Sequence, residues 1–150
     1  MTDNQKAAKD YLRQVKQMDD RIRKKEEEVE ELRERLILPA RNYQERVQGS
    51  KRPDTFEEKM AVLLDQQFDY VEYAIEYELF RDKLFMQVLN LDVEDAIYFA
   101  ILYHVYFKFM KMEDVAKVLG VSSQYLYHLH PEALRLFYDQ YLSGRGNDYV

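Results

Sequence analysis

Residues 112–138 read MEDVAKVLGVSSQYLYHLHPEALRLFY, and their pattern is the most informative in the chain. Apolar residues recur at helical spacing on both sides of Gly120, which predicts two helices joined by a tight turn. Gly120 can adopt the left-handed conformation that ends a helix, and Ser122 can cap the helix that follows. The residues that we expect to pack between the two helices are Val115, Ala116, Leu119, Leu126, Leu129 and Ala133. The pattern therefore predicts a helix-turn-helix, with an ordinary helical hairpin as the alternative.

The start of the second helix of a helix-turn-helix enters the major groove of DNA, so polar residues there are candidates for base contacts. Gln124 could form two hydrogen bonds with adenine, and Lys111 and Lys117 could hold backbone phosphates. Pro131 interrupts the pattern, and we expect the recognition helix to end near His130 and a further helix to begin there. The candidate DNA-contact residues are Ser122, Ser123, Gln124, Tyr127, His128, Lys111 and Lys117.

Residues 93–141, with DVAKVLGVSSQYLYHLHPEAL at their centre, resemble the DNA-binding region four of sigma factors. Together with the opening AKDYLRQVKQMDDRIRKKEEEVEELRERL, the chain is similar to small phage regulators of the ArpU/RinA type. The resemblance implies a cytoplasmic protein of a bacterial host that activates or otherwise regulates late phage genes. Its implied partners are promoter DNA and the host RNA polymerase.

The N-terminal 90 residues are expected to form a helical hairpin with helices at about 6–38 and 56–89, residues up to Gln5 being frayed. Thr55 is the expected cap of the second helix, and the connector at 39–55 is the most basic stretch. The first helix carries a heptad stripe that could pair with the second helix or with its copy in a homo-oligomer. The stripe consists of Ala8, Tyr11, Val15, Met18, Ile22, Lys25, Val29, Leu32 and Leu36.

Residues 91–150 are expected to form the sigma-like helix-turn-helix domain, which makes the whole chain all-α. A further helix should begin at Asn90 or Asp92, where acidic residues suit the positive end of a helix. Its residues Ile97, Ile101, Leu102 and Val105 are expected to lie under the helix-turn-helix. The many aromatic residues between Tyr98 and Phe109 fit core packing better than base stacking.

Several classes of protein find no support in the sequence. The chain has no cysteine, and His104, His128 and His130 lack the spacing of metal ligands, so we expect no metal or other cofactor. No phosphate-binding glycine loop or nucleophile motif occurs, so we expect no enzyme. No apolar run of about 18 residues predicts a membrane span, and the opening residues lack the apolar core of a signal peptide.

The net charge of −6 counts against strong DNA binding. Residues 91–150 hold five basic and eight acidic side chains, and the recognition helix has no Lys or Arg before Arg135. Few phosphate contacts predict a modest affinity that a second protein would have to supplement. The alternative function is therefore an adaptor with a helix-turn-helix fold, which binds a protein partner such as polymerase through its acidic helices, without DNA.

Overall fold

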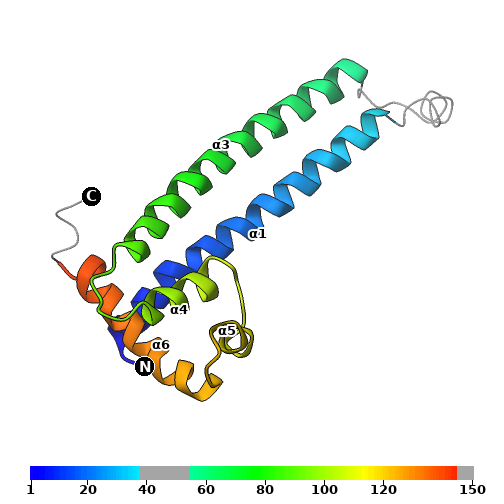
Figure 1. Ribbon diagram of the computed structural model, residues 1–150. Helices are drawn as coiled ribbons and strands as arrows, with labels where there is room; N and C mark the ends of the chain where they lie inside the picture. Colours follow the sequence, from blue (N-terminus) through cyan, green and yellow to red (C-terminus); the bar gives the residue numbers. More distant parts are fainter. Residues whose placement is uncertain (38–54, 145–150) are drawn as a thin grey trace. The chain divides into compact units, whose positions relative to one another are not determined.

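The computed structural model describes residues 1–37 and 55–144, and in these ranges the protein is all-α, as predicted, without a β-strand (Figure 1). The helices in chain order are α1 (Asp3–Ile37), α3 (Phe56–Leu89), α4 (Ile97–Tyr106), α5 (Met112–Leu119), α6 (Ser123–Phe137) and the π-helix η1 (Tyr138–Leu142). None of the helices in the described ranges has the length and apolar character to cross a membrane.

Both long helices begin with a capping box, in which two side chains satisfy backbone N–H groups reciprocally. Thr55 Oγ1 accepts from the Glu58 N–H, and Glu58 Oε2 accepts from the Thr55 N–H, which confirms the predicted cap of α3. Thr2 and Gln5 form the same arrangement at the start of α1. The expectation that residues up to Gln5 are frayed is therefore wrong, because this cap fixes the first turn. The predicted basic connector before Thr55 lies outside the described residues.

The described residues divide into two compact units, namely residues 19–37 with 55–77, and residues 1–18 with 78–144. Both α1 and α3 contribute to each unit, so the units differ from the predicted division at residue 90. The reason is that the first turns of α1 pack with the C-terminal helices. The ring of Tyr11 in α1 lies 6.0 Å from Phe80 of α3 and 6.0 Å from Phe137 of α6.

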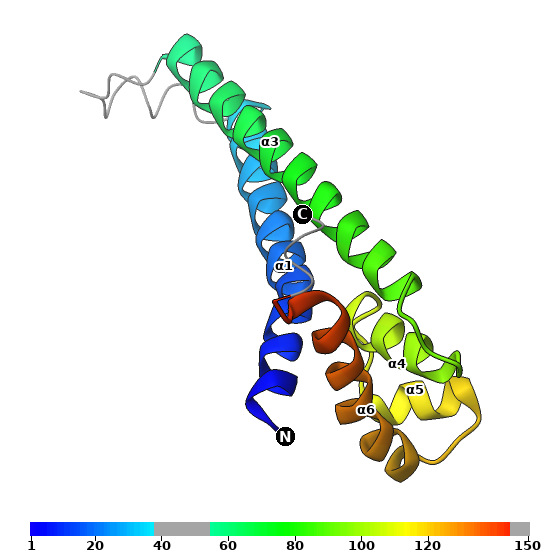
Figure 2. The same ribbon diagram turned by 90° about the vertical axis from the view of Figure 1, so that its left-hand side faces the viewer.

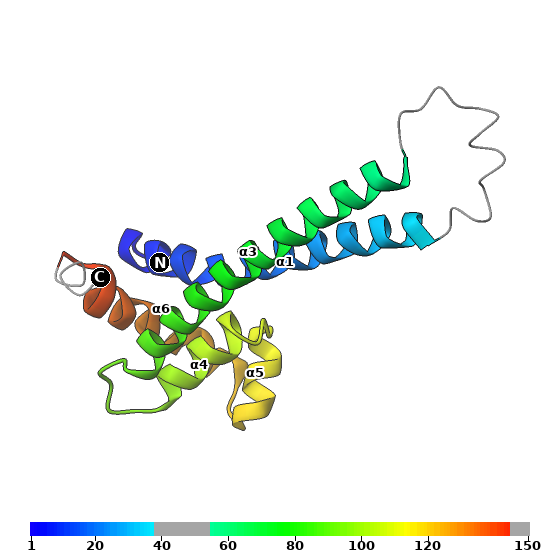
Figure 3. The ribbon, with the colours of Figure 1, turned by 90° about the horizontal axis from the view of Figure 1, so that it is seen from above.

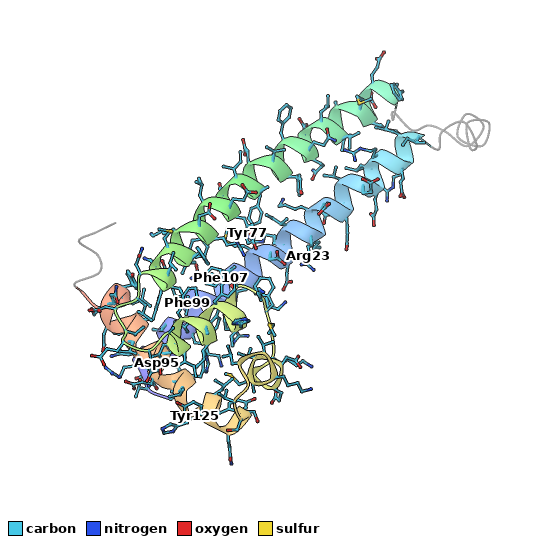
Figure 4. The ribbon with its side chains drawn as sticks, in the orientation of Figure 1. Arg23, Tyr77, Asp95, Phe99, Phe107 and Tyr125 are labelled. Carbon is cyan, nitrogen blue, oxygen red and sulfur yellow. The ribbon has the colours of Figure 1, made fainter. Side chains whose placement is uncertain are left out.

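The unit of residues 19–77 is a helical hairpin, whose two segments run side by side in Figure 3. Val29 and Leu36 of α1 are buried with Leu63 of α3, which shows that the C-terminal part of the heptad stripe packs on α3 within one chain. The Tyr77 hydroxyl donates to Asp19 Oδ1 at 3.1 Å, and Arg23 pairs with the same carboxylate at 3.0 Å (Figure 4). The predicted pairing of the first helix with the second is thus present in this unit.

In the other unit, α4 packs against α5 and α6 (Figure 2). The core between them is made of Ile101, Met112, Val115, Ala116 and Leu126, with Ile97, Val105, Leu119, Val121 and Leu129 packed around it. This core confirms that Ile97, Ile101 and Val105 lie under the helix-turn-helix. Leu102 is fully buried as well.

The start of α4 corrects the sequence prediction, because the helix begins at Ile97 and not at Asn90 or Asp92. The side chain of Gln140 holds the preceding loop. It accepts from the Asp92 N–H at 2.7 Å and donates to the Asn90 carbonyl at 3.0 Å. Asp95 Oδ1 then accepts from the Ile97 N–H at 3.0 Å, so the acidic residues form a turn ahead of the helix.

Aromatic rings of α3 and α4 form a cluster, as core packing predicts. The ring of Phe85 meets Tyr103 and Phe107 edge to face, at 5.8 Å in both cases. Phe99 stacks on Tyr103, also at 5.8 Å. Phe99 and Phe107 are labelled in Figure 4. Such pairs contribute about 1 kcal/mol each beyond area burial.

Pro131 lies inside α6, which continues without a break to Phe137, so the predicted helix end near His130 is wrong. A proline leaves the carbonyl four residues earlier without its helical partner, at a cost of about 3 kcal/mol. That carbonyl belongs to Tyr127, a residue with 54% exposure, so water can reach it. Burial of Leu134 and Phe137 beyond the proline holds the helix together.

Candidate nucleic-acid interface

The turn between α5 and α6 has the predicted geometry. Gly120 has φ +70°, and its N–H and that of Val121 both donate to the Ala116 carbonyl. Ser122 follows in an extended conformation, and its Oγ accepts from the Tyr125 N–H at 3.1 Å. These hydrogen bonds give partners to backbone groups at the end of α5 and at the start of α6 that would otherwise lack them. They confirm the roles predicted for Gly120 and Ser122.

The candidate recognition surface consists of Gln124, Tyr127 and His128, which are all exposed on α6. These three residues lie within about one helical turn of each other on the solvent side. Ser123 is half-buried, and Ser122 already serves as the cap. Lys111 at the start of α5 and Lys117 near its end are both exposed. Every candidate contact residue therefore lies on the helix-turn-helix, although the exposed Ser122 is engaged as the cap and Ser123 is half-buried.

An acidic side chain lies against the candidate recognition surface. The Tyr127 hydroxyl donates to Glu113 Oε1 of α5 at 2.8 Å. The pKa of Glu113 is lowered by a hydrogen bond from its own backbone and then by Tyr127. The same hydrogen bond raises the pKa of Tyr127, because ionisation would place two anions together. A carboxylate at this position repels phosphates and weakens any DNA binding.

The only basic side chain of α6 is also engaged. Arg135 bonds to Glu132 and forms an ion pair with Asp139 at 2.8 Å. This pairing raises the pKa of Arg135, while the contact with Arg135 lowers that of Glu132. Two carboxylates around one guanidinium leave α6 without a surplus of positive charge for phosphate.

His130 belongs to the core. It is 8% exposed, and its Nε2 lies 2.7 Å from the Tyr106 hydroxyl. Burial, assisted by the charge of Lys9, lowers the pKa of His130 to about 4. Burial likewise raises the pKa of Tyr106, so the phenol can donate to the neutral imidazole. Within the described ranges, no cluster of three or more His, Cys, Asp or Glu side chains could hold a metal ion.

Sequence reasoning missed two kinds of surface residue. Val118 and Tyr125 are exposed apolar residues on the helix-turn-helix, at 60% and 46% (Tyr125 is labelled in Figure 4). Lys9 and Arg13 of α1 line a cavity together with Tyr127. Their spacing of four residues on one helix face was the available signal, but nothing in the sequence placed α1 beside α6.

Comparisons of this chain with models of protein families, with curated proteins and with solved structures give no match.

Proposed function

We propose that this chain is a DNA-binding transcriptional regulator of a bacteriophage, an activator of late genes that acts at promoter DNA with the host RNA polymerase. The observation that carries the proposal is the α5–Gly120–α6 turn, which presents Gln124, Tyr127 and His128 to solvent. Their amide, hydroxyl and imidazole groups can form hydrogen bonds with base edges and phosphates. The assignment to phage promoters rests on the resemblance to sigma-like regulators.

A gel-shift titration on tiled phage DNA at two salt concentrations tests this function. The wild type should shift specific fragments, and Gln124→Ala/His128→Ala should lose that specificity because base contacts disappear. Gln14→Ala is the control, since it removes an exposed amide from α1 and leaves the helix-turn-helix intact. Absence of any shift by the wild type at low salt, with and without polymerase, would refute the proposal.

A second candidate function is an adaptor, and one face of α3 favours it. Leu64, Phe68, Val71 and Ile75 are 45–68% exposed, and their spacing places them on one helix face. Acidic residues adjoin this face, namely Asp65, Asp69, Glu72 and Glu76. No Lys or Arg occurs in the sequence between Lys59 and Arg81. An apolar face with acidic neighbours fits a basic amphipathic helix of a partner protein.

Fluorescence anisotropy with a labelled synthetic Lys/Leu amphipathic helix tests the adaptor. Phe68→Ser/Ile75→Ser should weaken binding, because the face loses the two apolar side chains that would anchor the partner helix. Phe56→Ser is the matched control, since Phe56 is 59% exposed on a different side of α3. Equal binding by all three proteins would contradict the adaptor. If light scattering shows that the protein is a dimer, a second copy of the chain is the occupant of this face. That result would contradict the adaptor function as well.

A further inference from the structure

Positive charge that the helix-turn-helix lacks is present at the opposite end of the chain. Residues 1–18 contain four basic and two acidic side chains, whereas residues 91–150 contain five and eight. The four bases follow one another at spacings of three, four and three residues, which places them on one face of α1. They are Lys6, Lys9, Arg13 and Lys16.

This basic row lies beside α6. The first turns of α1 run along α6 in Figure 2, and a cavity of about 440 Å³ is lined by residues of both helices. Lys9 and Arg13 line it from α1, and Tyr127 and Pro131 line it from α6. None of the described residues that line this cavity is acidic.

Electrostatic effects agree with this placement. The positive charge of Lys9 contributes to the low pKa of His130 on α6, after burial. Arg13 acts on Tyr106 of α4, where its charge opposes the rise in pKa that burial causes. The two cations are therefore close to buried groups of α6 and α4, although Arg13 itself is exposed and Lys9 is half-buried.

Local packing keeps this end of α1 in place. Lys16 lies 5.4 Å from the ring centre of Phe109, a cation–π distance. Phe109 has φ +57°, which a bulky residue adopts only where its surroundings hold it. Ala8, Leu12 and Val15 are fully buried on the adjoining face of the same helix. The basic row thus sits on a packed element.

Tyr127 connects the basic row with the candidate recognition surface, because it belongs to that surface and also lines the cavity. A helix in the major groove has a phosphate backbone along each side. Cations that lie next to α6 on its Tyr127 side would therefore be close to one of these two phosphate backbones. We propose that Lys9 and Arg13 of α1 bind backbone phosphates of duplex DNA beside α6. This inference rests on the proposed DNA-binding function.

Salt dependence is the appropriate readout, because phosphate contacts are independent of sequence. The probe is a labelled mixed-sequence duplex of about 30 base pairs, titrated with the full chain between about 50 and about 200 mM NaCl. Lys9→Gln/Arg13→Gln should reduce the slope of log K against log salt by about 1.8, or about 0.9 for each lost contact. Lys24→Gln/Arg35→Gln removes the same charge from exposed positions of α1 in the other unit and should leave the slope unchanged.

A charge-conserving variant, Lys9→Arg/Arg13→Lys, guards against a folding defect and should keep most of the wild-type slope. Circular dichroism of each variant accompanies the titration. If the wild type binds and Lys9→Gln/Arg13→Gln keeps its slope, or both Gln variants lose it equally, the inference is overturned while DNA binding stands. If the wild type does not bind the duplex even at low salt, the proposed function fails and the inference fails with it.

Discussion

The buried pair of His130 and Tyr106 should make the protein sensitive to mild acid. His130 has its pKa lowered from 6.5 to about 4, so the folded chain keeps it neutral where the unfolded chain protonates it. The unfolded state then binds more protons, and stability falls as the pH falls from about 6.5 towards about 4. With these two pKa values, His130 alone should lower the free energy of unfolding by about 2 kcal/mol between about pH 7 and about pH 5.

Urea unfolding at both pH values, followed by circular dichroism, measures this loss. His130→Gln keeps a hydrogen-bond acceptor for Tyr106 but does not titrate, so its stability should change less over the same interval. His128→Gln removes an exposed histidine and should behave as the wild type does. The reasoning is refuted if His130→Gln loses as much stability between the two pH values as the wild type. A direct NMR titration of His130 that gives a pKa near 6.5 would refute it as well.

Three further substitutions, two of them with a control substitution, test the helix-turn-helix. Gly120→Ala should destabilise the protein by about 1 to 2 kcal/mol in urea unfolding, from the left-handed backbone alone, because a Cβ there meets no atom within 4 Å. Leu126→Ala should cost about 2 to 5 kcal/mol, while the exposed Val118→Ala should cost under about 0.5 kcal/mol; equal losses would contradict the core described above. Glu113→Gln should raise the affinity for a mixed-sequence duplex several-fold at low salt, measured by anisotropy, and Glu72→Gln on α3 is its control. An unchanged affinity would show that Glu113 does not face the phosphates.

Local signals in the sequence were sufficient for the turn and for much of the core. Gly120 and Ser122 each act through neighbours within a few residues, so their conformations follow from residue type and position. Ala116 and Leu126 recur at helical spacing and therefore share a face wherever the helices lie. For the same reason the heptad stripe of α1 could be recognised, but not the identity of the helix that covers it.

The rest depended on contacts between distant parts of the chain. Pro131 ends a helix by local rules, yet burial of Leu134 and Phe137 outweighs its cost. The start of α4 depends on Gln140, a residue 48 positions after Asp92. Spacing alone could not foresee that Tyr11 meets Phe137, and this contact brings the basic row next to α6.

Net charge is a poor guide to what this surface can bind, because ions screen a charge beyond about 10 Å at moderate salt. The sum of −6 includes the acidic row from Asp65 to Glu76, which belongs to the hairpin unit. The electrostatic potential at a phosphate beside α6 would depend mainly on the nearest charged groups. Among these groups are Glu113, which is bonded to Tyr127, and the cations Lys9 and Arg13, which line the cavity. Substitutions of these few side chains, made singly and at several salt concentrations, therefore say more about DNA binding than the composition of the whole chain.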